Sequence, residues 1–260
     1  MKTVYFVIVL SILSFNNVLG RIRNGYESEL QSTKVSLQKL NLLLLEDKDM
    51  TSKQRVRIKS EIENLINYIS CYELTEELIH RLRIVSPDIY IEIDSIKDRR
   101  GRPTDVYVRL IPEEKSRVKL KAAGFFEQAP FDEDANVSKY GEYSVSVDVW
   151  IADNALFLLS HELGHVKYIV PHLATYSKFY SKQYPIEEVN VTCAGHYWHD
   201  QSGKYANSFE KRFCEDKKIY LQNGGKKLDS LVSLLIRIKR NIRNLEIVHP
   251  SPAIVSNYVF

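Results

Sequence analysis

The chain has 260 residues, 44% of them hydrophobic, which is enough for one substantial domain plus an appendage. It carries 36 Lys and Arg against 33 Asp and Glu, a formal net charge of +3. Because these charges are mixed along the chain rather than clustered, we expect no nucleic-acid partner. The most basic stretch, residues 237–243, is interpreted as the solvated face of a helix.

Residues 1–20 have the pattern of a secretory signal peptide. Lys2 precedes an apolar stretch from Val4 to Phe15, and Val18-Leu19-Gly20 offers small or branched residues for a signal peptidase. We expect cleavage after Gly20 and a secreted or periplasmic protein. The apolar run is too short for a comfortable membrane span, and no other segment approaches that length, so we expect no integral membrane segment after cleavage.

Residues 21–86 are predicted to form a helical hairpin. Apolar residues recur with helical spacing between Glu27 and Ile84, and Thr51 to Gln54 reads as a capping box that begins the second helix. Thr75 is a candidate start for a third helix. The hairpin carries enough leucine to pack against a main domain or a partner, and we find no chemistry in it.

Beyond Pro87 the pattern changes to strands. Residues 89–93 and 105–111 are predicted strands joined by a loop at 98–103, in which Gly101 is available for a positive φ. Residues 143–151 alternate strictly between apolar and polar side chains, which indicates a half-buried strand. Together these segments predict a small twisted sheet, and hence an α+β fold.

The sequence His161-Glu162-Leu163-Gly164-His165 is the one place where residue types and spacing together imply a reaction. Two histidines four residues apart lie on one face of a helix, so their imidazoles can converge on one metal ion, for which Zn²⁺ is the expected identity. Glu162 points a little around the helix, where it can act as general base toward a zinc-activated water instead of binding the metal.

The surroundings of this motif predict a buried helix. Asp153 or Asn154 is a candidate cap, and Pro171 closes the helix. The predicted core stripe avoids both histidines and consists of Leu156, Leu159, Leu163, Val166 and Val170. Burying two histidines in such a helix is costly unless a partner satisfies their nitrogens, and a metal does so.

A strand at 143–151 followed by a helix bearing HExxH resembles the zincin metallopeptidases over residues 140–172. The resemblance implies a zincin-like metallopeptidase domain over residues 87–260, a peptide or protein substrate, and an edge strand that pairs with the extended substrate beside the metal. It implies nothing about the oligomeric state.

A catalytic zinc usually takes three protein ligands, so a third ligand must lie downstream. The metzincin pattern is not met, because Tyr168 and Pro171 stand in its glycine and histidine positions and His172 comes one place late. The gluzincin pattern, with a glutamate on a second helix, favours Glu210, since Phe209 and Phe213 bury one side of a helix predicted at 206–220. That pattern would also place an aspartate four residues on to brace a histidine, where this chain has Cys214.

Other third ligands stay open. Glu187 and Glu188 lie in a sequence that looks extended, and a polar loop predicted at 195–203 carries the competing set His196, His199 and Asp200. Tyr197, His196 and His199 are also candidates to stabilise an oxyanion. A last helix is predicted at 228–245.

The leading interpretation is a secreted zinc-dependent metallopeptidase with metal ligands His161, His165 and Glu210 and with Glu162 as catalytic base. The alternative is a zincin-like metal-binding interaction protein without proteolytic activity. A third option is a self-inhibited peptidase whose amino-terminal helices cover the cleft. Of the three cysteines, Cys193 and Cys214 are candidates for a bridge, which leaves Cys71 free, and the alternative is three buried thiols.

Overall fold

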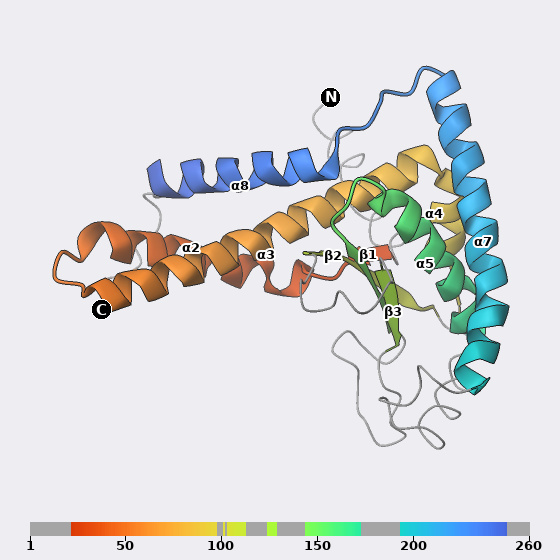
Figure 1. Cartoon of the computed structure of the whole chain (residues 1–260), viewed down its shortest axis with the longest axis horizontal. Coiled ribbons are helices and arrows are strands. Elements are labelled where there is room, and N and C mark those ends of the chain that lie inside the picture. The colour runs from red at the N-terminus through yellow and green to blue at the C-terminus, as the bar shows by residue number, and fades with distance from the viewer. Residues whose placement is uncertain are drawn as a thin grey trace, which may run out of the picture.

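The computed structural model describes residues 22–97, 101, 103–112, 124–128, 144–172 and 193–248, and has the expected α+β composition (Figure 1). The predicted signal segment, Glu187 and Glu188 lie outside these residues. The elements in chain order are β1 (Ile22–Asn24), α2 (Glu27–Glu46), α3 (Ser52–Val85), α4 (Pro87–Asp94), β2 (Asp105–Ile111), β3 (Gly124–Gln128), β4 (Ser144–Trp150), α5 (Ala155–Ile169), η2 (Val170–His172), α7 (Cys193–Gln222) and α8 (Leu231–Val248).

The described strands form one sheet in the order β1-β2-β4-β3. β1, β2 and β4 run parallel, and β3 is antiparallel to β4 at the end of this sheet. On each central strand alternate apolar residues share one buried face, as expected for period-two side chains, and on β4 Ser146 and Asp148 of the other face are buried as well. The buried apolar positions are Val106, Val108 and Leu110 on β2 and Val145, Val147 and Val149 on β4. The predicted strands at 105–111 and 143–151 are present as β2 and β4, but β4 is an internal strand with both faces buried, so the prediction that it is half-buried is wrong.

The strand predicted at 89–93 is wrong, because this segment forms helix α4. Pro87 occupies the first turn, where its missing N–H costs nothing. Ile89 and Ile93, four residues apart, are fully buried on one helical face, whereas Ile91 between them is 61% exposed. The place beside β2 is taken by β1 instead. Gly101, in the segment after α4, has the expected positive φ of 76°.

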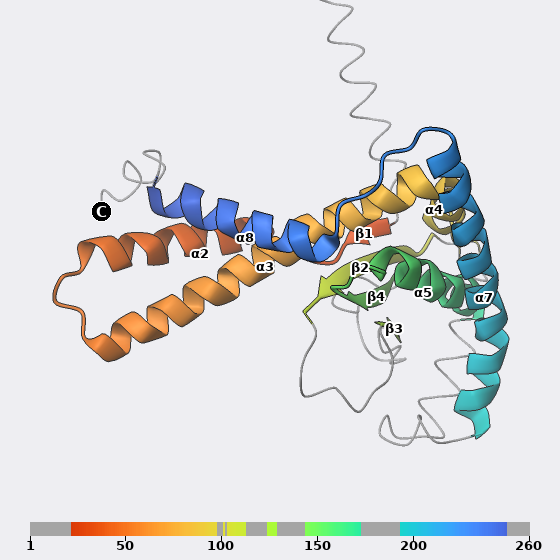
Figure 2. The same cartoon turned by 45° about the horizontal axis from the view of Figure 1, so that its top comes forward.

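The predicted helical hairpin is formed by α2 and α3, which lie side by side in Figures 1 and 2. The capping box is confirmed: the Gln54 amide donates to the Thr51 hydroxyl, and the Gln54 side chain accepts from the Thr51 amide. Thr75 does not begin a helix. It lies inside α3, and its buried hydroxyl accepts a 2.9 Å hydrogen bond from the Leu110 amide of β2.

Helix α3 takes part in two hydrophobic cores. Its first half packs Ile62, Ile66 and Ile69 against Leu37 of α2, whereas its second half places Leu74, Leu78 and Leu82 in the core that also holds the sheet and α5. Helix α8 lies along α3 as well, with Leu231 in the main core and Ile242 against the second (Figure 2). We call α2, the first half of α3 and α8 the helical arm.

The HExxH helix α5 packs on the sheet and is buried along its predicted stripe. All five residues of its core stripe are buried, and Phe209 and Phe213 of α7 are buried as well. Helix α7 runs along α5 at the end of the molecule away from the hairpin turn (Figure 1). None of the described helices combines the length and apolarity that a membrane span requires.

The loop predicted at 195–203 is wrong, because α7 is helical from Cys193 onward. This helix also rules out a bridge within the chain between Cys193 and Cys214. Twenty-one residues of α-helix separate their Cα atoms by about 31 Å at a rise of about 1.5 Å per residue, whereas a disulfide needs less than about 7 Å.

Candidate metal centre

The centre lies where α5 and α7 cross, and Gly164 makes the crossing possible. A β-carbon on Gly164 would lie 2.4 Å from the Cα of Ala206 and 2.6 Å from the carbonyl oxygen of Tyr205. Any side chain at position 164 would thus collide with the backbone of α7. The close approach brings two side chains of α7 into contact with the histidines of α5, which precede and follow Gly164 in the sequence.

Glu210 of α7 contacts the first histidine. Its carboxylate Oε1 is 2.7 Å from Nδ1 of His161. A carboxylate can only accept, so Nδ1 carries the proton in this contact. In the neutral imidazole Nε2 is then left with a free lone pair, which is the form that binds a metal. A carboxylate on the second ring nitrogen also fixes the ring and makes the ligand more basic.

Ser202, two turns earlier on α7, contacts the second histidine. Its hydroxyl oxygen lies 2.8 Å from Nδ1 of His165. Both groups are buried, and the exposed fraction of His165 is 7%. When Nδ1 of His165 donates to this hydroxyl, Nε2 of His165 is also left with a lone pair. Each histidine is therefore held through Nδ1 by one residue of the same partner helix.

The two remaining nitrogens face each other. Nε2 of His161 and Nε2 of His165 are 3.1 Å apart. Two nitrogens bound at about 2.0–2.1 Å to one tetrahedral zinc would be about 3.3 Å apart, so the observed separation fits a shared ion. With both Nδ1 atoms protonated, two lone pairs meet at this distance, and a cation between them removes their repulsion. The donor set therefore fits zinc.

Glu162 is largely buried beside the histidines, with an exposed fraction of 8%. Burial raises the pKa of its carboxyl to about 7, and the nearby His161 opposes that shift in part. No hydrogen bond or ion pair joins the Glu162 carboxylate to another residue of the described chain. A carboxyl group with a pKa near neutrality suits proton transfer in both directions.

His161, Glu162 and His165 lie together on α5, and Glu210 of α7 contacts His161. Glu210 lies on the nitrogen of His161 that does not face His165, so in this arrangement it positions the ring. Within the described side chains, no group of three or more His, Cys, Asp and Glu converges as a metal site. Binding of the metal by Glu210 needs another side-chain conformation and stays a prediction.

The competing third ligands lie on the first turns of α7, where the backbone is described and the side chains of residues 193–201 are not. Position 199 is one turn before Ser202, on the helical face that also carries Ala206 and Glu210. Position 200 is instead in register with the exposed residues Lys204 and Asn207. His172 falls in η2, after the end of α5.

Searches against known protein families, curated proteins and solved structures found no match for this chain. The description of the centre therefore depends on the geometry of its own residues. Sequence reasoning missed Ser202 and the part played by Ala206, since a serine and an alanine in a polar stretch carry no motif. The small residues at 202, 203 and 206 were the available signal for a close helix crossing.

Proposed function

We propose that this protein is a secreted zinc-dependent peptidase whose zinc is held by His161 and His165. The observation that supports this most is the 3.1 Å approach of the two Nε2 atoms, each on a ring whose other nitrogen contacts α7. A structural zinc site needs no general base, whereas Glu162 lies beside the two histidines with no hydrogen-bond or ion-pair partner among the described residues. A hydrolytic function thus explains the presence of Glu162, which metal binding alone does not.

Bound zinc would supply a Lewis acid that polarises the peptide carbonyl and makes water easier to deprotonate. The residues of this chain would do the rest. Glu162 would accept the proton of the attacking water and hand it to the amine that leaves. Glu210 and Ser202 would keep the two imidazoles in the ligand tautomer and orientation throughout.

The proposal for substrate binding changes with the sheet topology. An extended peptide adds to the free edge of a sheet through backbone hydrogen bonds. β4 has neighbours on both sides, so the edge strands of the described sheet are β1 and β3, of which β3 lies beside both β4 and α5. We therefore assign the substrate-pairing role to Gly124–Gln128.

The third ligand departs from the gluzincin pattern. In that pattern the acid that braces a histidine follows the ligand glutamate by four residues on the same helix. With Glu210 in the bracing position, the ligand position falls on Ala206, which is fully buried and has no donor atom. His196, His199 and Asp200, at the start of α7, therefore stay in competition with a reoriented Glu210.

The decisive experiment compares Glu162→Gln with the parent protein in zinc content and in cleavage of casein. The amide keeps the shape of the side chain but cannot accept the proton, so we expect unchanged zinc and a loss of activity of about 100-fold or more. His161→Ala should lose the zinc itself. Equal turnover by Glu162→Gln and the parent, or no turnover by the zinc-loaded parent across a peptide library, would favour the metal-binding interaction protein.

The self-inhibited form of this proposal gains no support from the arrangement of the arm. In Figures 1 and 2 the turn between α2 and α3 lies at the opposite end of the molecule from α7. The hairpin end of the arm thus points away from the two histidines.

A further inference from the structure

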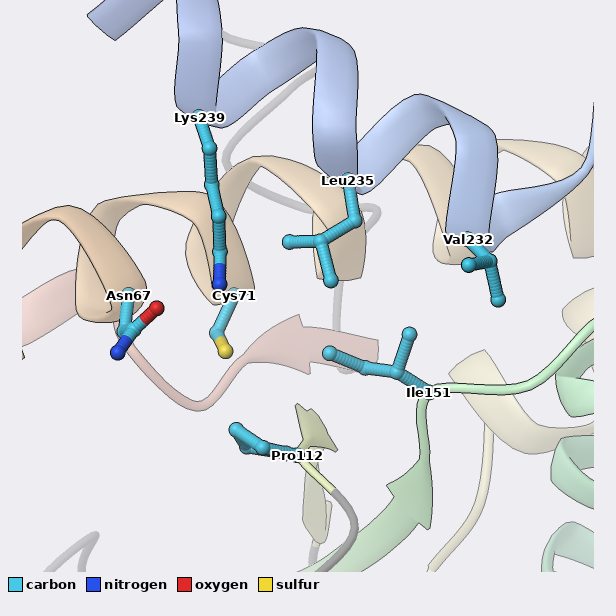
Figure 3. A pocket seen from close by; sticks show the side chains of 7 residues that line it. All are labelled: Asn67, Cys71, Pro112, Ile151, Val232, Leu235 and Lys239. Carbon is cyan, nitrogen blue, oxygen red and sulfur yellow. The ribbon is translucent and has the colours of Figure 1, made fainter. Parts of the chain in front are cut away.

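A cavity of about 280 Å³ lies between the helical arm and the sheet, apart from the metal centre. Residues of α3 and α8 form one side, and Pro112 and Ile151, which directly follow β2 and β4, form the other (Figure 3). The cavity is thus at the carboxyl ends of two neighbouring parallel strands. Ligands of sheets with parallel strands commonly bind outside this end.

The cavity is apolar at one end and carries polar groups, among them the Lys239 ammonium, at the other. Val232, Leu235 and Ile151 supply hydrocarbon, as Figure 3 shows. At the other end the Lys239 ammonium reaches down from α8 toward Asn67 and Cys71 of α3. None of the seven lining residues is acidic. The lining therefore has a positive charge with no negative charge to balance it.

Lys239 has no acidic partner among the described residues, unlike two other cations of α8. Arg237 pairs with Asp229, and Arg243 pairs with Glu63 at 2.6 Å. Within the described chain, Lys239 forms no ion pair or hydrogen bond, and its charge acts on the Cys71 thiol instead. An amine turned toward a half-enclosed apolar cavity gives up part of its hydration, which an anion in the cavity would restore.

We propose that this cavity binds a small aliphatic carboxylate, a fatty acid of about six to eight carbons, with its carboxylate on Lys239 and Asn67 and its chain among Val232, Leu235 and Ile151. At roughly 30 Å³ for a water-sized group, the cavity holds on the order of nine heavy atoms. That matches hexanoate to octanoate.

The test measures binding of the straight-chain carboxylates from butyrate to decanoate to the purified protein by calorimetry. Each methylene that enters the cavity should tighten binding about fourfold, until the cavity is full near octanoate. Octanol should bind at least about tenfold more weakly than octanoate, because it brings no charge to Lys239. Equal affinity for octanol and octanoate, or affinity that does not depend on chain length, would overturn the proposal.

Variants locate the binding. Lys239→Met should weaken octanoate by about tenfold or more, whereas Arg240→Met removes the same charge from the exposed side of α8 and should leave affinity unchanged. Val232→Trp keeps the charge and fills the cavity, so it should abolish binding in a protein whose circular dichroism matches the parent. His161→Ala should bind octanoate normally. Loss of binding in His161→Ala or in Arg240→Met, or normal binding in Val232→Trp, would place the carboxylate elsewhere.

Discussion

Gly164 and Ala206 bring α5 and α7 into backbone contact, with the Cα of Ala206 at 2.4 Å from the point where a β-carbon on Gly164 would stand. The Glu210–His161 and Ser202–His165 contacts lie on either side of this point. The glycine in the middle of the HExxH sequence thus sets the distance at which the partner helix holds both histidines.

Gly164→Ala should separate the two helices, because the added methyl group meets backbone that cannot rotate away. We expect a loss of about 1–3 kcal/mol in the free energy of unfolding, measured by urea denaturation, together with weaker zinc binding. Gly203→Ala is the matched control, since nothing lies within 4 Å of its β-carbon position on α7. It should be neutral or stabilise by about 0.5–1 kcal/mol. Equal stability of the two variants would contradict the close crossing.

Glu210→Gln separates a bracing role from a ligand role. The amide oxygen of glutamine can still accept the hydrogen bond from Nδ1 of His161, but an amide is a poor ligand for zinc. If Glu210 braces the ring, Glu210→Gln should bind zinc within about tenfold of the parent, while Glu210→Ala should lose about 10–100-fold. Chelator competition gives both affinities. A loss in Glu210→Gln as large as that in His165→Ala would instead make Glu210 a ligand.

Cys71 and Cys214 should differ sharply in reactivity. Burial raises the pKa of the Cys71 thiol to about 11, and the charge of Lys239 offsets only part of that rise, whereas Cys214 is exposed. At pH 8 about one Cys71 thiol in a thousand is ionised, and the thiolate is the reactive form. Iodoacetamide should therefore modify Cys214 quickly and Cys71 only after denaturation, as peptide mapping by mass spectrometry would show. Rapid modification of Cys71 in the folded protein would show that it is accessible.

Glu92 of α4 joins two other helices through Lys167 of α5 and Arg212 of α7. Burial opposes ionisation of Glu92, but hydrogen bonds from these two cations and their charges outweigh it and hold its pKa below the usual value. A carboxyl with a lowered folded pKa stabilises the protein above its unfolded pKa of about 4.3, and this contribution disappears as the pH falls through the folded pKa.

Glu92→Gln should accordingly be less stable than the parent at pH 7, and the difference should shrink as the pH is lowered below about 4. Thermal unfolding across this range measures it. Glu61→Gln is the control, because its exposed pair with Arg57 lies within one helix of the arm and should contribute little. A difference for Glu92→Gln that does not depend on pH would rule out the charge network as its cause.

The sequence predicted correctly those elements whose apolar spacing fits only one type of secondary structure. The stripe of α5 is spaced for a helix alone, and every predicted core position on it is buried. The apolar spacing of segment 89–93 fits both a strand and a helix. Isoleucines at alternate positions lie on one face of a strand, but the first and last of them also lie on one face of a helix. Pro87 and packing against the rest of the chain select the helix there, and neither effect is visible in the local alternation.

The candidate site divides in the same way. His161, Glu162 and His165 are predictable because a metal imposes their spacing on a single helix. The contacts of Ser202 and Glu210 with the Nδ1 atoms depend on how α7 lies against α5, and they join residues 37 and 49 positions apart in the sequence. The two glycines at 195 and 203 suggested a loop, but a glycine inside a helix costs only about 1 kcal/mol, and Gly203 has open space around it.

Because α3 contributes to both hydrophobic cores, the helical hairpin and the rest of the protein should not fold as separate fragments. Cutting the chain near residue 86, where the sequence changes from helical to strand patterns, would remove Leu74, Leu78 and Leu82 from the wall behind the sheet. Thirty-four residues of helix form a strut about 51 Å long. A force applied to the hairpin would therefore be transmitted through α3 to the sheet. Because both cores share this helix, the arm and the rest of the domain should unfold in one cooperative transition.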